Sequence, residues 1–200
     1  MRTKTTCQSE KVLEAAARLF GTQRFHEVRM EDIAAEAAVG KGTLYRYFAD
    51  KEELYWALLT HSSAQLSRRL EEVLEPAHGA RQQLEAMVEA IIAFFDENPH
   101  LFDLIQRAEV HHRPGVASPW QQTRDDLLRL LLGLFEAGQR QGEFTIRHPD
   151  LAALMLLGGL RSVIRFGKRP RSRELARQIV TDFLRGADMS QSCLVTEKIE

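Results

Sequence analysis

The chain has 200 residues, 44% of them hydrophobic and 28% charged, a balance typical of globular proteins and too apolar for a disordered chain. Its net charge of −1 argues against indiscriminate nucleic-acid binding over the whole surface. No apolar run approaches the roughly 18–20 residues of a membrane span. The N-terminal residues lack a secretory signal, and Cys7 and Cys193 lack metal-ligand spacing. We therefore expect a cytoplasmic protein without cofactor, metal or membrane association.

The N-terminal segment is predicted to be a short polar arm followed by a helix. Residues 2–9 carry Arg2 and Lys4, which either reach a phosphate or are simply solvated. Residues 9–22 place apolar side chains at helical spacing and predict the first helix. Residues 1–48 hold eight Lys or Arg and six Asp or Glu, so the positive excess of the chain lies in this part.

Residues 28–54 form the most informative stretch. Two short helical patterns flank a turn at residues 38–40, where Gly40 supplies a backbone position free of side-chain steric cost. In the second helix, Leu44 and Phe48 lie four apart and are predicted to pack inward. Phe25, in the loop before this stretch, is expected to fill the small core with Ile33, Leu44 and Phe48.

The remaining side chains of this second helix suit contact with DNA. Lys41 and Arg46 can meet phosphates, and the hydroxyls of Thr43, Tyr45 and Tyr47 can bind phosphates or base edges. A solvated helical face is the plain alternative for a short basic segment. Two exposed tyrosines beside two cations, preceded by a helix and a tight turn, favour a helix that reads the major groove.

The run IAAEAAVGKGTLYRYFADKEEL resembles the DNA-binding signature of the TetR family of transcriptional regulators. The resemblance covers residues 21–58 and implies a helix-turn-helix. It implies that Gly42, Thr43 and Tyr45 touch bases or the adjacent backbone, while Tyr47 and Lys51 bind phosphates. Together with the cations, the expected DNA-binding residues are Arg29, Lys41, Gly42, Thr43, Tyr45, Arg46, Tyr47 and Lys51.

The sequence departs from the family pattern at two positions. Ala38 stands where the family usually has Gly, which suggests a slightly different turn. Arg29 stands where the family often has Ser or Thr, so a probable N-cap is lost while a phosphate contact can be gained. Operator preference therefore does not follow from the resemblance.

The rest of the chain is predicted to be helical, so the fold class is all-α with about nine helices. Asp50 and Glu53 form a capping pattern for a helix that runs to about residue 75 and connects the N-terminal module to the rest. Further helices are expected at 80–97, 101–110, 120–139 and 149–166, and a last one capped by Ser172. We assign residues 1–54 to DNA binding and 55–200 to effector binding and dimerisation.

The last two predicted helices have apolar faces broader than one side of a monomer needs. Gly158 and Gly159 lie in the middle of the first, where they cost helix stability unless another backbone approaches. We expect a homodimer interface at Met155, Gly158, Gly159, Ile179 and Phe183. A helix pair buried within one chain is the alternative.

The middle helices are rich in aromatic residues, and the resemblance implies a cavity there for a small-molecule effector. Candidate pocket residues are Phe94, Phe95, Phe102, Gln106, Trp120, Arg124, Phe135 and Arg161. Plain core is the equal alternative for each of them. His111 and His112 lack a third metal ligand at suitable spacing, so a solvated loop is the better interpretation.

No catalytic motif stands out: the sequence has no phosphate-binding Gly-rich loop, nucleophile elbow, HExxH or CxxC. We therefore expect a regulator rather than an enzyme: a homodimer that binds a double-stranded DNA operator and is released by a small-molecule effector. The alternatives are a DNA-binding factor controlled by a protein partner or by no ligand and, more remotely, an all-helical enzyme.

Overall fold

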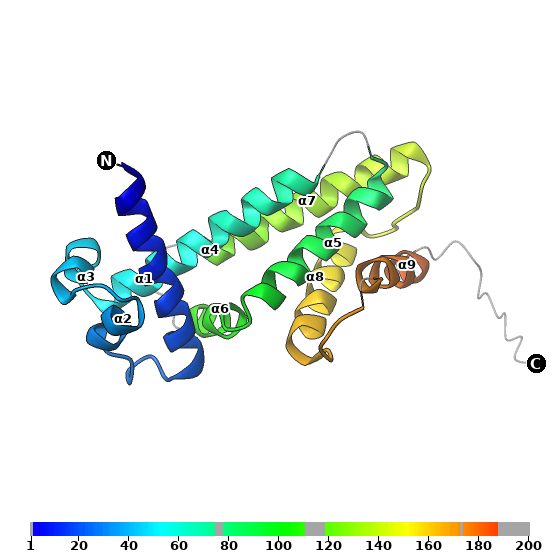
Figure 1. Cartoon of the computed structure of the whole chain (residues 1–200). Helices are drawn as coiled ribbons and strands as arrows, with labels where there is room; N and C mark the ends of the chain where they lie inside the picture. The colour runs from blue at the N-terminus through cyan, green and yellow to red at the C-terminus, as the bar shows by residue number, and fades with distance from the viewer. Residues whose placement is uncertain (1, 75–77, 111–118, 173, 188–200) are drawn as a thin grey trace, which may run out of the picture. The chain divides into compact units, whose positions relative to one another are not determined.

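A computed structural model of the chain describes residues 2–74, 78–110, 119–172 and 174–187, and within these ranges it contains helices and no strand (Figure 1). The all-α prediction is confirmed for this part of the chain. The helices are α1 (Arg2–Thr22), α2 (Met30–Glu36), α3 (Lys41–Tyr47), α4 (Lys51–Val73), α5 (Ala80–Glu97), α6 (Leu101–Val110), α7 (Pro119–Gln141), α8 (Pro149–Phe166) and α9 (Leu175–Ala187). None of these helices combines the length and apolarity that crossing a bilayer requires.

The chain divides into two compact units. The first comprises residues 1–69 and 94–124, and the second comprises residues 70–93 and 125–200. Helices α4, α5 and α7 each contribute one part to each unit. The domain boundary expected at residue 54 stays a prediction.

Most helix limits fall where the sequence places them, because proline, glycine and acidic caps mark them. Helix α8 begins with Pro149 and ends where the Gly167 N–H donates to the Val163 carbonyl at 2.9 Å. At the start of α4, the Glu53 N–H donates to the Asp50 carboxylate at 2.7 Å. The Glu53 carboxylate in turn accepts the Ala49 N–H at 2.6 Å, so the predicted capping pattern is confirmed.

Two predicted ends are wrong. Helix α1 begins at Arg2, so the polar arm expected at residues 2–9 is helical; no proline or glycine interrupts this segment. Helix α9 begins at Leu175, and the Ser172 hydroxyl accepts the Glu174 N–H at 3.2 Å just before it. His111, His112 and the tail from residue 188 lie outside the described residues.

The turn between α2 and α3 uses a different residue from the one expected. Gly40 has φ −68° and ψ 145°, an extended conformation open to any residue, so the role predicted for it is wrong. Ala38 has φ +53° and occupies the left-handed region. The residue with a left-handed backbone conformation in this turn is therefore an alanine.

The side chains inside the first unit explain how α2, α3 and α4 are positioned. Ile33, Leu44 and Phe48 are buried as predicted. Phe25 packs elsewhere than expected: its ring stacks on Phe20 with centroids 5.4 Å apart and meets the Tyr55 ring edge-on at 5.4 Å. This loop aromatic therefore joins the end of α1 to the first turns of α4.

Two helix ends in the second unit are capped by side chains from outside the helix. The Glu143 carboxylate accepts the N–H groups of Ala80 and Arg81 at 3.2 and 2.8 Å, which caps the start of α5. The Arg171 guanidinium donates to the carbonyls of Val163 and Ile164 at the end of α8, both at 3.0 Å. These side chains satisfy backbone groups that a helix leaves without intrahelical partners.

The left-handed conformation of Ala38 generates a prediction about stability. An alanine at positive φ costs about 1–2 kcal/mol, whereas glycine there loses about 0.5–1 kcal/mol of extra entropy on folding. We expect Ala38→Gly to raise the free energy of unfolding by up to about 1 kcal/mol, measured by urea denaturation. Gly40→Ala is the matched control and should not raise it by the same route, since Gly40 has negative φ. A clear loss of stability in Ala38→Gly would contradict the strain at this position.

Candidate nucleic-acid interface

Helix α3 presents a polar, cationic face to solvent. Lys41, Tyr45 and Arg46 are exposed, whereas Thr43 and Tyr47 are half-buried and Leu44 is fully buried beneath them. Tyr45 is 48% exposed, more than core packing would leave a large aromatic ring. The arrangement predicted from the sequence is therefore confirmed in its geometry: one buried edge fixes the helix, and the opposite face carries hydroxyls and cations.

Lys41 is partly neutralised by a neighbour on α2. Its ammonium lies 3.4 Å from the Glu31 carboxylate, with both side chains substantially exposed. The pKa of Glu31 is held below its usual value by a hydrogen bond from its backbone N–H and by the Lys41 ammonium. Glu31 was not identified from the sequence, because the two residues lie on different helices and only the folded turn brings them together. The pair is solvent-exposed and therefore weak.

Tyr47 is oriented by α1 and by its own helix. Its hydroxyl donates to the Gln8 side-chain oxygen at 3.4 Å, and the Arg46 guanidinium lies 5.2 Å from its ring centroid. Gln8 cannot be recognised as a partner from the sequence, because it lies in the segment predicted to be a polar arm. A second contact, between Arg18 of α1 and Glu36 of α2 at 2.9 Å, orients α2 against α1.

Gly42 and Arg29 are exposed near the starts of α3 and α2. A Cβ added at Gly42 would meet no heavy atom within 4 Å outside its immediate chain neighbours and helix backbone, so the fold itself does not demand glycine there. Arg29 is exposed and precedes α2. Its backbone N–H donates to the Asp32 carboxylate at 3.2 Å, so Asp32 supplies a cap contact at this helix end.

Lys51 contributes to the structure in a way the sequence did not reveal. Its ammonium donates to the carbonyls of Phe25 and Val28, at 2.5 and 2.9 Å, and lies 4.5 Å from the Phe25 ring centroid. The cation therefore ties the first residue of α4 to the loop between α1 and α2. A phosphate contact by Lys51 stays a prediction, but two of its three N–H donors already have acceptors.

The first turns of α4 are also connected to α6. The Tyr55 hydroxyl donates to the Leu104 carbonyl at 2.7 Å, and its ring packs edge-on against Phe20 at 5.5 Å. Gly21, at the end of α1, lies so close to His100 that an added Cβ would be 2.0 Å from the His100 Cβ. Helices α1 and α4 are therefore joined to α6 and to the residue before it through small and aromatic side chains.

The candidate effector residues fall into two groups. In the first unit, Phe95 contacts the rings of Phe94, Phe102 and Trp120 at centroid distances of 5.4, 5.6 and 6.0 Å. Gln106 is half-buried and Arg124 exposed in that unit. In the second unit, Phe135 is fully buried and stacks on Phe183 at 5.9 Å, and Arg161 is exposed. An effector site at these residues stays a prediction.

Helix α8 exposes an apolar stripe. Leu151, Leu154, Met155 and Phe166 are 56%, 56%, 64% and 80% exposed, although all four are large and hydrophobic. Gly158 and Gly159 lie between them in the chain, and an added Cβ at either would meet no heavy atom of a neighbouring element within 4 Å. Ile179 and Phe183 of α9 are half-buried. The sequence had identified Met155 and the glycines but not the three other exposed side chains.

Two family models match the chain and together span most of it. Residues 12–58 match the bacterial regulatory proteins of the TetR family, and residues 77–186 match the tetracyclin repressor-like C-terminal domain. The regulator UidR of Escherichia coli K12 is 24% identical over 155 residues, which cover 78% of this chain and 76% of UidR. The activator FasR of Mycolicibacterium smegmatis is 32% identical over 108 residues, 54% of this chain and 49% of FasR.

Solved structures share the fold. A TetR-family regulatory protein from Rhodococcus RHA1 superposes with a TM-score of 0.77 at 20% identity, covering 92% of this chain and 98% of that one. The regulator FadR of Bacillus subtilis, solved in complex with stearoyl-CoA, has a TM-score of 0.71 at 20% identity, covering 88% and 98%. Both of these solved structures therefore share the fold of this chain.

The contacts of Lys51 generate a prediction. Lys51→Met keeps the apolar stem over Phe25 but removes two charge-assisted hydrogen bonds, so we expect the free energy of unfolding to fall by about 1–3 kcal/mol. Lys41→Met, which removes an exposed ion pair, should cost no more than about 1 kcal/mol. Chemical denaturation of both variants measures the difference. Equal stability of Lys51→Met and the wild type would show that the ammonium does not hold the loop.

Proposed function

Since this chain belongs to the TetR family of bacterial regulatory proteins and is a DNA-binding transcriptional regulator rather than an enzyme, we propose that it acts as a homodimeric repressor. It binds a palindromic operator and leaves it when a small-molecule effector binds. The observation that carries the proposal is the exposed face of α3, where hydroxyls and cations stand over a buried apolar edge.

We assign the side chains of α3 to two kinds of contact. Tyr45 and Thr43 read base edges through their hydroxyls, and Gly42 lets the DNA backbone approach the start of the helix. Lys41, Arg46, Tyr47 and Arg29 contact phosphates, which fix the position of the helix on the duplex. Lys51 acts mainly by holding the loop before α2 against α4, because its ammonium already binds two carbonyls.

The exposed stripe of α8 supports a dimer. Four large apolar side chains in solvent are costly for a monomer, and a patch of this kind marks a surface that another protein covers. A second copy of α8 and α9 packed across a two-fold axis would bury the stripe and bring two backbones together at Gly158 and Gly159. The α3 helices of the two copies, which we call the reader helices, then engage half-sites about 34 Å apart, or a multiple of that spacing.

We propose an effector with an apolar acyl chain. Phe94, Phe95, Phe102 and Trp120 pack ring against ring in the core of the first unit, where an acyl chain that entered would meet apolar side chains, and FadR, which shares the fold, is solved with stearoyl-CoA. The effector favours a state in which the two reader helices no longer match both half-sites. To move the population from 1:99 to 99:1, it must bind that state more tightly by about 5.5 kcal/mol.

The readout assigned to α3 can be tested on any operator that the protein selects. Tyr45→Ala should weaken operator binding by about 1–3 kcal/mol and relax the preference at one position of each half-site. Lys41→Met should weaken binding to all sequences alike and reduce the dependence of affinity on salt. Fluorescence anisotropy at several salt concentrations measures both effects. Unchanged operator affinity in Tyr45→Ala would remove this residue from the readout.

The dimer can be tested by placing a charge on the stripe. Met155→Glu puts two unpaired carboxylates into the proposed interface, which should weaken the dimer by at least about 3 kcal/mol and lower operator affinity with it. Analytical ultracentrifugation gives the association state and circular dichroism the fold. Gln139→Glu, at an exposed position of α7, is the matched control and should remain dimeric. A Met155→Glu variant that dimerises like the wild type would place the interface elsewhere.

A further inference from the structure

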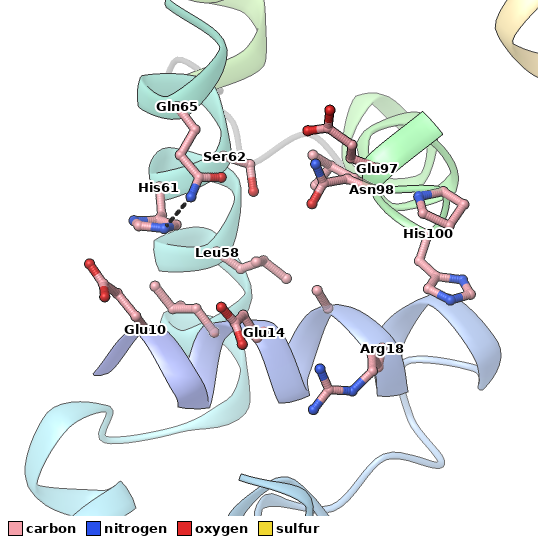
Figure 2. A pocket seen from close by; sticks show the side chains of 14 residues that line it. Glu10, Glu14, Arg18, Leu58, His61, Ser62, Gln65, Glu97, Asn98 and His100 are labelled. Carbon is pink, nitrogen blue, oxygen red and sulfur yellow. Dashed lines mark hydrogen bonds between the residues drawn. The ribbon is translucent and has the colours of Figure 1, made fainter. Parts of the chain in front are cut away.

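A cavity of about 630 Å³ lies among α1, the middle of α4, and the corner where α5 ends and α6 begins (Figure 2). This volume lies within the roughly 300–1,000 Å³ of sites that bind small molecules. All of its lining residues belong to the first compact unit. None of them is among the residues assigned above to DNA, to the effector or to the dimer interface.

The inner wall of the cavity is apolar. Leu13 from α1, Leu58 from α4 and Leu101 from α6 line it, and each is at least nine-tenths buried. Ala17 adds a small side chain on the α1 side, which leaves room where a larger residue would fill the space. This wall suits a hydrocarbon body.

Ser62 is the buried polar group of this cavity. The residue is only 5% exposed, and its hydroxyl forms no hydrogen bond with any residue that the structure describes. Nearby Thr60 shows the usual solution for a helical hydroxyl, donating to the Trp56 carbonyl four residues earlier at 2.9 Å. In Figure 2 the Ser62 side chain points from α4 into the space between the helices. A hydroxyl on a buried residue that faces a cavity is available to bond to a ligand there.

Three further residues supply acceptors around the same space. The Asn98 amide nitrogen donates to the Phe94 carbonyl at 2.9 Å, so its amide oxygen is left as an acceptor. Glu10 and Glu14 of α1 line the cavity and form no ion pair with any residue in the described ranges. The acceptors therefore come from α1, α4 and the α5–α6 corner.

The remaining charged and titratable groups of the lining are already engaged with other side chains or lie at its edge. Arg18 binds Glu36 at 2.9 Å, and the Glu97 carboxylate accepts two hydrogen bonds from Arg69, at 2.6 and 2.9 Å. His61 is hydrogen-bonded to Gln65 at 2.9 Å, and His100 sits against Gly21. The uncompensated charge of the cavity is therefore negative.

We propose that this cavity is a second ligand site, which binds a small molecule carrying a primary ammonium group on an apolar body. A primary ammonium has three N–H donors and no acceptor, which matches the Ser62 hydroxyl, the Asn98 amide oxygen and the Glu14 carboxylate. The apolar body lies against Leu13, Leu58 and Leu101. A carboxylate ligand is repelled by the exposed carboxylates of Glu10 and Glu14, and a neutral alcohol gains no charge attraction from them. An occupant of this kind bridges α1 to α4.

Isothermal titration calorimetry of the full chain, without DNA, tests the proposal. The probe is n-octylammonium, and octan-1-ol and octanoate have the same chain length with no charge and with negative charge. We expect one saturable site per chain for octylammonium, with both controls weaker by about 10-fold or more, as a charge-assisted hydrogen bond implies. Because no DNA is present, the result does not depend on the operator or on the effector proposed above.

Variants place the binding in the cavity. Glu14→Gln should weaken octylammonium binding by about 10-fold and Ser62→Ala by about 5-fold, while Ala17→Leu should abolish it by filling the space. Glu72→Gln, on α4 outside the cavity, is the matched control and should bind like the wild type. Thermal unfolding of each variant without ligand verifies the fold. Absence of saturable binding, equal binding of the three probes, or wild-type affinity in both Glu14→Gln and Ser62→Ala would overturn the proposal.

Discussion

The ammonium group of Lys51 fixes the loop before α2 to the first residue of α4. It stands at the first residue of α4, where the helix dipole disfavours a cation. The carbonyls of Phe25 and Val28 and the face of the Phe25 ring compensate for that position. Around it, Phe20, Phe25 and Tyr55 pack their rings together. The loop between α1 and α2 is thereby held against α4, and α2 and α3 follow from that loop.

This attachment defines how a signal can reach the reader helix. Tyr55 lies one turn beyond Lys51 and donates to the Leu104 carbonyl of α6 at 2.7 Å. A displacement of α6 that breaks or carries this hydrogen bond acts directly on the first turns of α4, and through Lys51 on the loop before α2. The proposed effector and an occupant of the cavity beside Ser62 would both act through these contacts. The two ligands would act through the same contacts of α4, although they differ in chemistry.

Sequence reasoning succeeded where local chemistry decides the structure. Proline and glycine mark the two ends of α8, and Asp50 and Glu53 mark the start of α4. The spacing of Leu44 and Phe48 predicts the buried edge of α3. It failed where contacts between distant residues decide. The left-handed conformation of Ala38 has no signal in the residue type, because alanine disfavours it. The two carbonyls that Lys51 binds, and the partners Gln8 and Glu31, become visible only once the helices are assembled.

Selection of bound DNA from a random pool with the purified full-length protein tests the central claim most directly. The account predicts recovery of a palindrome that two copies of the chain occupy, with half-sites separated by about one helical turn or a multiple of it. Recovery of a site without two-fold symmetry, bound by a single copy, would contradict the dimeric reader. Absence of any enrichment, repeated with cell extract added to supply a missing ligand, would contradict the assignment of α3 to sequence recognition.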